Sequence, residues 1–150
     1  MKIEDKLNNS IKDSMKKRDT IRLDSLRAVK SAILIEKTKT GSKGDIDDAI
    51  VIKILQKMVK QRNESAKIYM DQQREELANI EISQSKIISE FLPEQLNDYE
   101  LSDIIEKVIK DTNAISMKDI GNVISIVNQK VSGRSPGKTI AEIVKKKLMK

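Results

Sequence analysis

Aliphatic residues recur every three or four positions along almost the whole chain, which is the spacing of one face of an α-helix. Ile3, Leu7, Ile11 and Met15 show this spacing and predict a first helix with these four side chains on its buried face. No stretch alternates apolar and polar residues for long enough to indicate a strand. The sequence therefore predicts an all-α fold.

Three further helices are predicted in the first part of the chain. Asp19 is expected to cap the second helix, and Asp45, Asp47 and Asp48 place negative charge at the start of the third. The apolar stripes of these helices are, in chain order, Leu23, Leu26, Val29, Ile33 and Leu34; Val51, Ile54, Leu55, Met58, Ala66 and Tyr69; and Leu77, Ile80, Ile87, Ile88 and Phe91. The pattern leaves open whether the third and fourth helices are separate, because residues 71–75 fit either case.

Pro93 ends this first group of helices, because proline lacks a backbone N–H and disfavours helix in the residue before it. We place a domain boundary between Pro93 and Asn97. It divides the chain into an N-terminal helical domain of about four helices, residues 1–94, and a small C-terminal three-helix domain, residues 95–150. A three-helix domain of that size is marginally stable alone, so we expect it to lean on the first domain or on a partner.

Local signals place the ends of the three C-terminal helices. Asp98 is expected to cap the first of them, and Ser116 with Asp119 resembles a capping box at the start of the second. Gly133 suits a C-cap, and Pro136 suits the first turn of the last helix.

The chain has no Cys, no His and no Trp. Disulfides, thiolate nucleophiles and zinc fingers are therefore excluded, and so are imidazole bases, Ser-His-Asp triads and metal sites that use His. The only aromatic side chains are Tyr69, Phe91 and Tyr99, so stacking of bases on aromatic rings is nearly excluded as a binding mode. Neither Asp47-Asp48 nor Glu75-Glu76 has the arrangement of a paired acid/base site, and we expect no catalytic residue, no metal and no cofactor.

No apolar run approaches the ~20 residues that cross a bilayer, and the charged N-terminus lacks the apolar region of a signal peptide. We therefore expect a cytoplasmic protein with no membrane contact.

Positive charge is concentrated at the C-terminus. Residues 129–150 contain one acid, Glu142, and seven basic residues: Lys130, Arg134, Lys138, Lys145, Lys146, Lys147 and Lys150. This segment alone accounts for the formal charge of +6 of the whole chain. Local basicity is the pattern expected of a nucleic-acid-binding surface, although a solvated helix end with lysines favoured by the helix dipole gives the same pattern.

The turn at residues 133–139 (GRSPGKT) ends like a phosphate-binding loop. It has Ser132 where such a loop needs glycine, however, and no strand is predicted before it. A tight turn between two helices is one interpretation. The other places Arg134 and Lys138 beside a helix N-terminus, which attracts phosphate of any kind.

Several polar residues fall on or beside stripes that should be buried. Arg22 and Arg27 do so on the second helix, and Arg62 does so on the third, within the segment that also holds Lys60 and Glu64. A buried arginine needs a carboxylate or a bound anion. These five residues therefore form either an ion-pair network that braces the helices or a crevice that holds phosphate or carboxylate.

Six segments in this order resemble the GatB/YqeY family. They are residues 22–27 (RLDSLR) with Ala32 and Ile33, 60–65 (KQRNES) with Tyr69, 74–78 (REELA), 91–96 (FLPEQL) with Glu100 and Leu101, 116–121 (SMKDIG) and 133–138 (GRSPGK). The resemblance covers essentially the full length. The chain departs from the family at Gln73, where Gly is frequent, and at Ser135-Pro136, where Ala-Asp is frequent.

The resemblance implies an all-helical fold in two parts and kinship with the C-terminal tail of the B subunit of tRNA-dependent amidotransferases. Those enzymes convert Glu-tRNA(Gln) or Asp-tRNA(Asn) to the amide; their helical tail contacts tRNA, and the transfer chemistry lies in a domain that has no counterpart in these 150 residues. The family label, a carbon–nitrogen ligase with glutamine as amido-N-donor, thus describes the relatives' complex. We do not expect this chain to catalyse that reaction by itself.

Three hypotheses follow. The first is a non-catalytic tRNA-binding or accessory protein, with amidotransferase or aminoacyl-tRNA machinery as a partner, in which Arg134, Lys138, Lys145, Lys146 and Lys147 meet phosphates. The second is a protein-interaction module whose C-terminal domain docks through an apolar face. The third is an enzyme that uses Arg22, Arg62 and Glu64 on a small acidic substrate.

Overall fold

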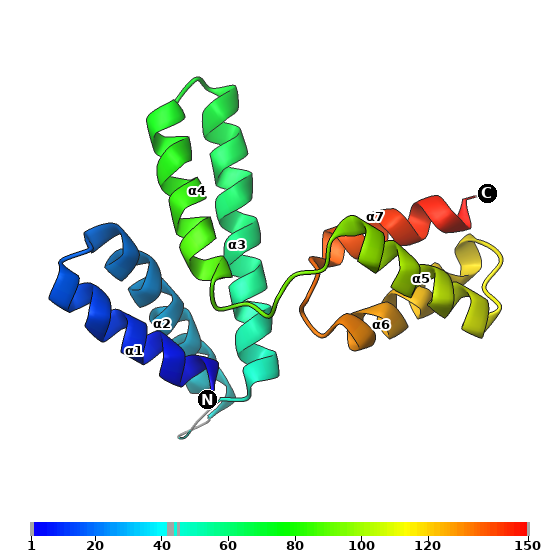
Figure 1. Cartoon of the computed structure of the whole chain (residues 1–150), viewed down its shortest axis with the longest axis horizontal. Coiled ribbons are helices and arrows are strands. Elements are labelled where there is room, and N and C mark those ends of the chain that lie inside the picture. Colours follow the sequence, from blue (N-terminus) through cyan, green and yellow to red (C-terminus); the bar gives the residue numbers. More distant parts are fainter. Residues whose placement is uncertain (1, 42–43, 45, 150) are drawn as a thin grey trace. The chain divides into compact units, whose positions relative to one another are not determined.

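The computed structural model describes residues 2–41, 44 and 46–149, and in these residues it contains helices and no strand (Figure 1). The predicted all-α class is confirmed. The elements are α1 (Ile3–Lys17), α2 (Thr20–Thr40), α3 (Asp48–Asp71), α4 (Glu75–Ser89), α5 (Asp98–Thr112), the short 3-10 helix η1 (Met117–Asp119), α6 (Ile120–Val131) and α7 (Gly137–Leu148). The predictions for Asp45 and Lys150 fall outside the described residues.

The chain divides into two compact units, Met1–Leu92 and Pro93–Lys150, and each unit has its own apolar core. The core of the first unit consists of Ile3, Leu7, Ile11, Leu26, Val29, Ile33, Ile46, Val51, Leu55, Met58 and Ile88. The core of the second consists of Leu101, Ile105, Val108, Val123, Val127, Val131, Ile140, Val144 and Leu148. Both cores are almost wholly aliphatic, as expected for a chain with so few aromatic residues.

In the first unit, α1 pairs with α2, and α3 and α4 form an antiparallel hairpin against which α2 packs (Figure 1). Acidic side chains satisfy the free N–H groups at two helix starts. Asp47 caps α3 by accepting from the Ala49 N–H at 3.3 Å. Asp48 accepts instead from the Ile3 N–H at 3.2 Å, which ties the start of α1 to the start of α3.

The α3–α4 turn settles what the sequence left open, because the two helices are separate. Gln73 stands at a φ of 60°, in the left-handed region that favours glycine, and this is the position where the family often has Gly. The Arg74 N–H donates to the Tyr69 carbonyl at 2.8 Å and thereby closes the end of α3. Ala66 and Ala78 are buried near the turn, so small side chains stand where the two helices approach.

Some predicted core residues are exposed, and helix geometry explains each case. Met15 is 53% exposed, whereas Ser14 is buried, because each step of four residues turns the stripe by about 40°. Leu34 is 63% exposed because it stands about 100° around α2 from the buried Ile33.

The predictions for Leu77 and Ile80 were wrong for the same reason. Both side chains are exposed, since α4 turns Ala78, the residue after Leu77, towards the core.

In the second unit, α5, α6 and α7 all pack against one another. The predicted cap at Asp98 was wrong by one position, because Asn97 caps α5 and forms a reciprocal capping box with Glu100. The predicted capping box of Ser116 and Asp119 is confirmed, and it opens η1, after which α6 begins at Ile120.

The ends of α6 and α7 differ slightly from expectation. Ser132, with a φ of 45°, takes the C-cap position of α6 that was predicted for Gly133, although Gly133 follows with a φ of 82°. Pro136 stands just before α7, at its N-cap position, rather than in its first turn.

The α5 cap gives a direct test of the fold. We expect Asn97→Ala to lower the free energy of unfolding of the second unit by about 1 kcal/mol, because the backbone N–H of Glu100 loses the side-chain oxygen that accepts its hydrogen bond. Asp98→Ala is the matched control and should cost less than about 0.5 kcal/mol, since Asp98 contributes only charge near the helix start. Urea unfolding followed by circular dichroism measures both, and a larger loss for Asp98→Ala would contradict the observed cap.

Candidate nucleic-acid interface

Helix α7 presents a basic face on the side opposite its buried stripe. The stripe consists of Ile140, Val144 and Leu148. The opposite face holds Lys138, Glu142, Lys145, Lys146 and Met149, all of them exposed. The helix thus forms because its apolar side packs on α5 and α6, and the same packing fixes the direction in which the lysines point.

Three of the predicted phosphate contacts, Lys138, Lys145 and Lys146, are exposed, and none of them is ion-paired with a described residue. Glu142 is a near neighbour of all three on the helix surface, since it lies four residues after Lys138 and three and four residues before the other two. The face therefore carries a net charge of about +2 that the described residues do not neutralise.

Lys147 has a different environment from its two neighbours. Its Nζ lies 2.6 Å from Oε1 of Glu106 on α5, and its side chain is only 21% exposed. It therefore braces α7 against α5. The sequence spacing indicates this partly buried position, because Lys147 precedes the buried Leu148 and lies at the margin of the apolar stripe.

Arg134 holds the turn that precedes α7. Its Nε donates to the carbonyl of Glu94 at 3.0 Å, and its own carbonyl accepts from the Leu96 N–H at 2.8 Å. The Gln95 side chain adds a third link, donating to the Gly133 carbonyl at 3.1 Å. The segment after Pro93 is thus fastened to the turn. Because α6 rather than a strand precedes this turn, it lacks the context of a nucleotide-binding phosphate loop.

The first turn of α7 has no side-chain cap. Its N–H groups and the helix dipole therefore favour an anion beside Lys138.

A shallow groove of about 590 Å³ runs along the same face of α7. Asp98 and Ser102 of α5 line one side, and Ile143, Lys146 and Met149 of α7 line the other. Two of the predicted lysines, Lys145 and Lys146, thus border a concave surface that is partly apolar.

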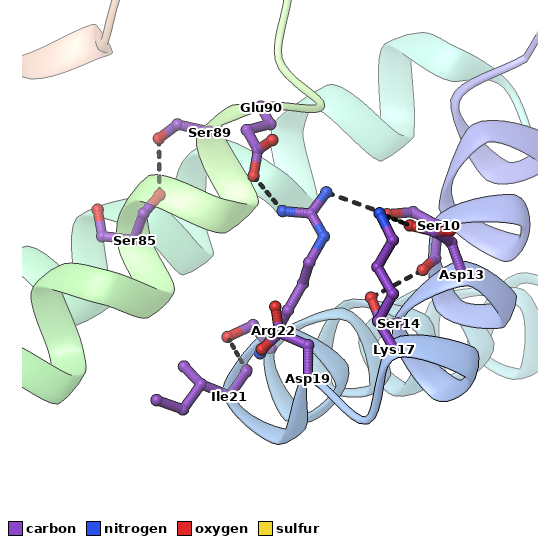
Figure 2. Close-up of polar contacts among 11 residues, drawn as sticks. Ser10, Asp13, Ser14, Lys17, Asp19, Ile21, Arg22, Ser85, Ser89 and Glu90 are labelled. Atoms are coloured by element: carbon purple, nitrogen blue, oxygen red, sulfur yellow. Dashed lines mark hydrogen bonds and ion pairs between the residues drawn. The ribbon is translucent and has the colours of Figure 1, made fainter.

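Arg22 joins three helices of the first unit (Figure 2). Its Nη1 lies 2.6 Å from Oε2 of Glu90 at the end of α4, and its Nη2 donates to Oγ of Ser10 on α1 at 3.0 Å. Its backbone N–H is capped by Asp19, as predicted for the start of α2. The Arg22 side chain is 27% exposed and that of Glu90 51%, so this is a partly solvated brace.

Arg62 is half-buried and binds different partners. Its Nε donates to Oε1 of Gln84 at 3.0 Å, and its Nη1 donates to the carbonyl of Met58 at 3.4 Å. Arg27, Lys60 and Glu64 are exposed, and no described hydrogen bond or ion pair joins them to Arg22 or Arg62. The polar contacts therefore connect Arg22 and Arg62 separately to α4 and do not gather the five residues into one group.

We expect Arg22→Met to lower the free energy of unfolding of the first unit by about 1 kcal/mol, because a partly exposed pair with a second hydrogen bond is lost. A double-mutant cycle with Glu90→Gln should give a coupling of about 0.5 kcal/mol. Arg27→Met serves as the control and should stay within about 0.5 kcal/mol of the parent. Equal losses for the two arginines would contradict the brace.

In the part of the chain that the structure describes, no helix has an apolar stretch sufficient to span a bilayer. No group of three or more acidic, His or Cys side chains in those residues could hold a metal ion.

Comparison with known proteins identifies the family. A family model described as Yqey-like protein matches residues 4–148. The chain belongs to the YqeY-like family. The match spans both units, so it confirms the resemblance that the short motifs indicated.

The chain is also similar to a curated protein. It is the "Altered inheritance of mitochondria protein 41, mitochondrial" of Clavispora lusitaniae (strain ATCC 42720), 27% identical over 122 residues. The aligned part covers 81% of this chain and 69% of the relative.

Proposed function

We propose that this YqeY-like chain is a non-catalytic protein that binds tRNA through contacts between α7 and the phosphate backbone. The observation that carries the proposal is the set of three exposed lysines, Lys138, Lys145 and Lys146, none of which forms an ion pair with a described carboxylate. The kinship of the family with the amidotransferase tail supports tRNA as the RNA. The proposal places the chain in the cytoplasm, as an accessory to amidotransferase or aminoacyl-tRNA machinery.

The chemistry of lysine determines what kind of recognition is expected. An ammonium group is a compact point charge that attracts phosphate without reading base sequence. Stacking contributes little, because the exposed Tyr99 is the only aromatic ring in the second unit. Selectivity would therefore come from the shape of a folded RNA, and affinity from charge.

Glu142, the acid on the basic face, provides a test in which a substitution should increase the affinity for tRNA. We expect Glu142→Gln to tighten tRNA binding by about two- to threefold at low salt, because it removes the one negative charge among the three lysines. Fluorescence anisotropy of labelled tRNA with the full chain measures this. The matched control is Asp103→Gln, which removes an acid from an exposed position of α5. Glu100 is unsuitable as a control because its carboxylate caps that helix. If both variants bind tRNA as the parent does, α7 is not the contact surface.

The groove beside α7 favours a second candidate function, a protein-interaction module. The exposed Met149 and the half-buried Ile143 would receive an apolar side chain of the partner, and the lysines would confer solubility. Affinity capture with and without nuclease separates the two functions. A partner retained after nuclease, and lost on Met149→Asp, would support the module. Loss of all partners on nuclease treatment would support the RNA-binding protein.

A further inference from the structure

Helix α3 carries a second row of lysines that the net charge of the sequence conceals. Lys53, Lys57, Lys60 and Lys67 are all exposed. At 100° per residue they fall within an arc of about 80°, opposite the buried stripe of Val51, Leu55 and Met58. From the first to the last they extend about 21 Å along the helix. We name these four residues the α3 lysine row.

The row is not balanced by partners in the described part of the chain. None of its lysines forms an ion pair with a described residue. Its first three members occupy successive turns with no acid between them on that face. Glu64 interrupts the row between Lys60 and Lys67, and Asp71 follows Lys67 on the same face, so positive charge is greatest at the N-terminal half of the helix.

The row also accounts for part of the motif at residues 60–65. Packing divides this motif between two sides of α3: Arg62 and Ser65 are half-buried towards the core, whereas Lys60 and Glu64 face solvent. The inward half has a structural task, since Arg62 bonds to Gln84 of α4. The outward half has no partner among the described residues.

We propose that the α3 lysine row is a second phosphate-contacting surface, and that the backbone of the RNA bound by α7 is its ligand. This inference rests on the proposed function. A straight row of lysines on a rigid helix fits a polyanion whose charges continue over a comparable length, as those of a nucleic-acid strand do.

Two other polyanions fit less well. A helix that lies on a lipid surface needs a free apolar face to enter the interface, and the apolar face of α3 is buried against α2 and α4. Carboxylate recognition on an acidic protein favours the forked geometry of arginine, and the row contains lysines only.

The test uses the full chain, labelled tRNA and three variants. The first variant, the α3 variant, has Gln in place of Lys53, Lys57 and Lys60. The control replaces Lys6, Lys12 and Lys16 of α1, three exposed lysines of the same unit, and removes the same net charge. The third replaces Lys138, Lys145 and Lys146 by Gln. The slope of log K against log salt concentration is measured for each.

We expect the α3 variant to reduce the magnitude of this slope by about 2, whereas the α1 control changes it by less than about 0.5. Lysine acetylation followed by mass spectrometry gives an independent measurement, in which tRNA should protect Lys53, Lys57 and Lys60 but not Lys12.

Each other outcome has a distinct meaning. If the α3 and α1 variants behave alike while the α7 variant loses affinity, the α3 inference is wrong and the proposed function stands. If only the α3 variant loses affinity, the row contacts tRNA but α7 does not, so the assignment to α7 is wrong and so is the claim that the two surfaces share one RNA. If the parent does not bind tRNA, both are wrong. A last outcome concerns vesicles of anionic lipid. If the parent binds them and the α3 variant does not, while both bind tRNA equally, the row contacts a membrane surface and the inference is wrong.

Discussion

Replacing Lys138, Lys145 and Lys146 together by Glu is expected to lower the affinity of the chain for tRNA by at least about 100-fold at low salt. The change removes three phosphate contacts and sets three carboxylates against the RNA, so attraction is lost and repulsion is added. The three side chains are exposed and have no ion-pair partner in the described structure, so the fold should be retained. Anisotropy with labelled tRNA measures the affinity, and circular dichroism checks the helices.

The control for this variant keeps its charge change but moves it within the same unit. Lys107, Lys110 and Lys118 are exposed lysines outside α7, and their joint replacement by Glu alters the net charge equally. We expect the fold-loss of affinity in the control to be less than about a tenth of the fold-loss in the α7 variant, since only long-range repulsion acts. Equal losses would mean that net charge alone determines binding, and α7 would not be the contact surface.

Ile105→Ala is expected to unfold the second unit. Ile105 is fully buried in the core of that unit, and such a truncation costs about 2–5 kcal/mol. A domain of about 60 residues buries little surface and has a stability of the same order. Backbone amides of α5, α6 and α7 should therefore lose their protection from hydrogen exchange, whereas those of α1 to α4 should keep it because their core is separate.

The chain offers a matched control in the same unit. Ile115 is 86% exposed, and Ile115→Ala should change the free energy of unfolding by less than about 0.5 kcal/mol. Loss of protection in α1 to α4 of the Ile105 variant would show that the two units unfold together. That result would contradict two independent cores.

Much of the fold follows from local signals. The spacing of apolar residues predicts the long helices except for the division between α3 and α4, and the caps at Asp19 and Ser116 form as their side-chain chemistry predicts. Errors arise where two neighbouring residues can serve equally well. Asn97 and Asp98 are both good caps, and only the backbone geometry selects Asn97.

The candidate site is less predictable, because sequence shows which charges a chain has and not where their partners lie. Lys145, Lys146 and Lys147 look alike in a run, yet among the residues that the structure describes only Lys147 of the three forms an ion pair, with Glu106, forty-one residues away in the chain. The net charge of a segment also does not show how its charges are distributed in space. The segment before residue 129 has no net charge, yet the lysines of α3 all lie on one face of that helix.

The salt dependence of tRNA binding tests the central claim most directly. The parent chain is compared with the variant in which Lys138, Lys145 and Lys146 are replaced by Gln, from about 50 to about 200 mM salt. The account predicts that the parent binds tRNA and that the magnitude of its slope of log K against log salt exceeds that of the variant by about 2 to 3, because three counterion-releasing contacts are lost. Parallel lines for the two proteins, or a parent that does not bind, would contradict it.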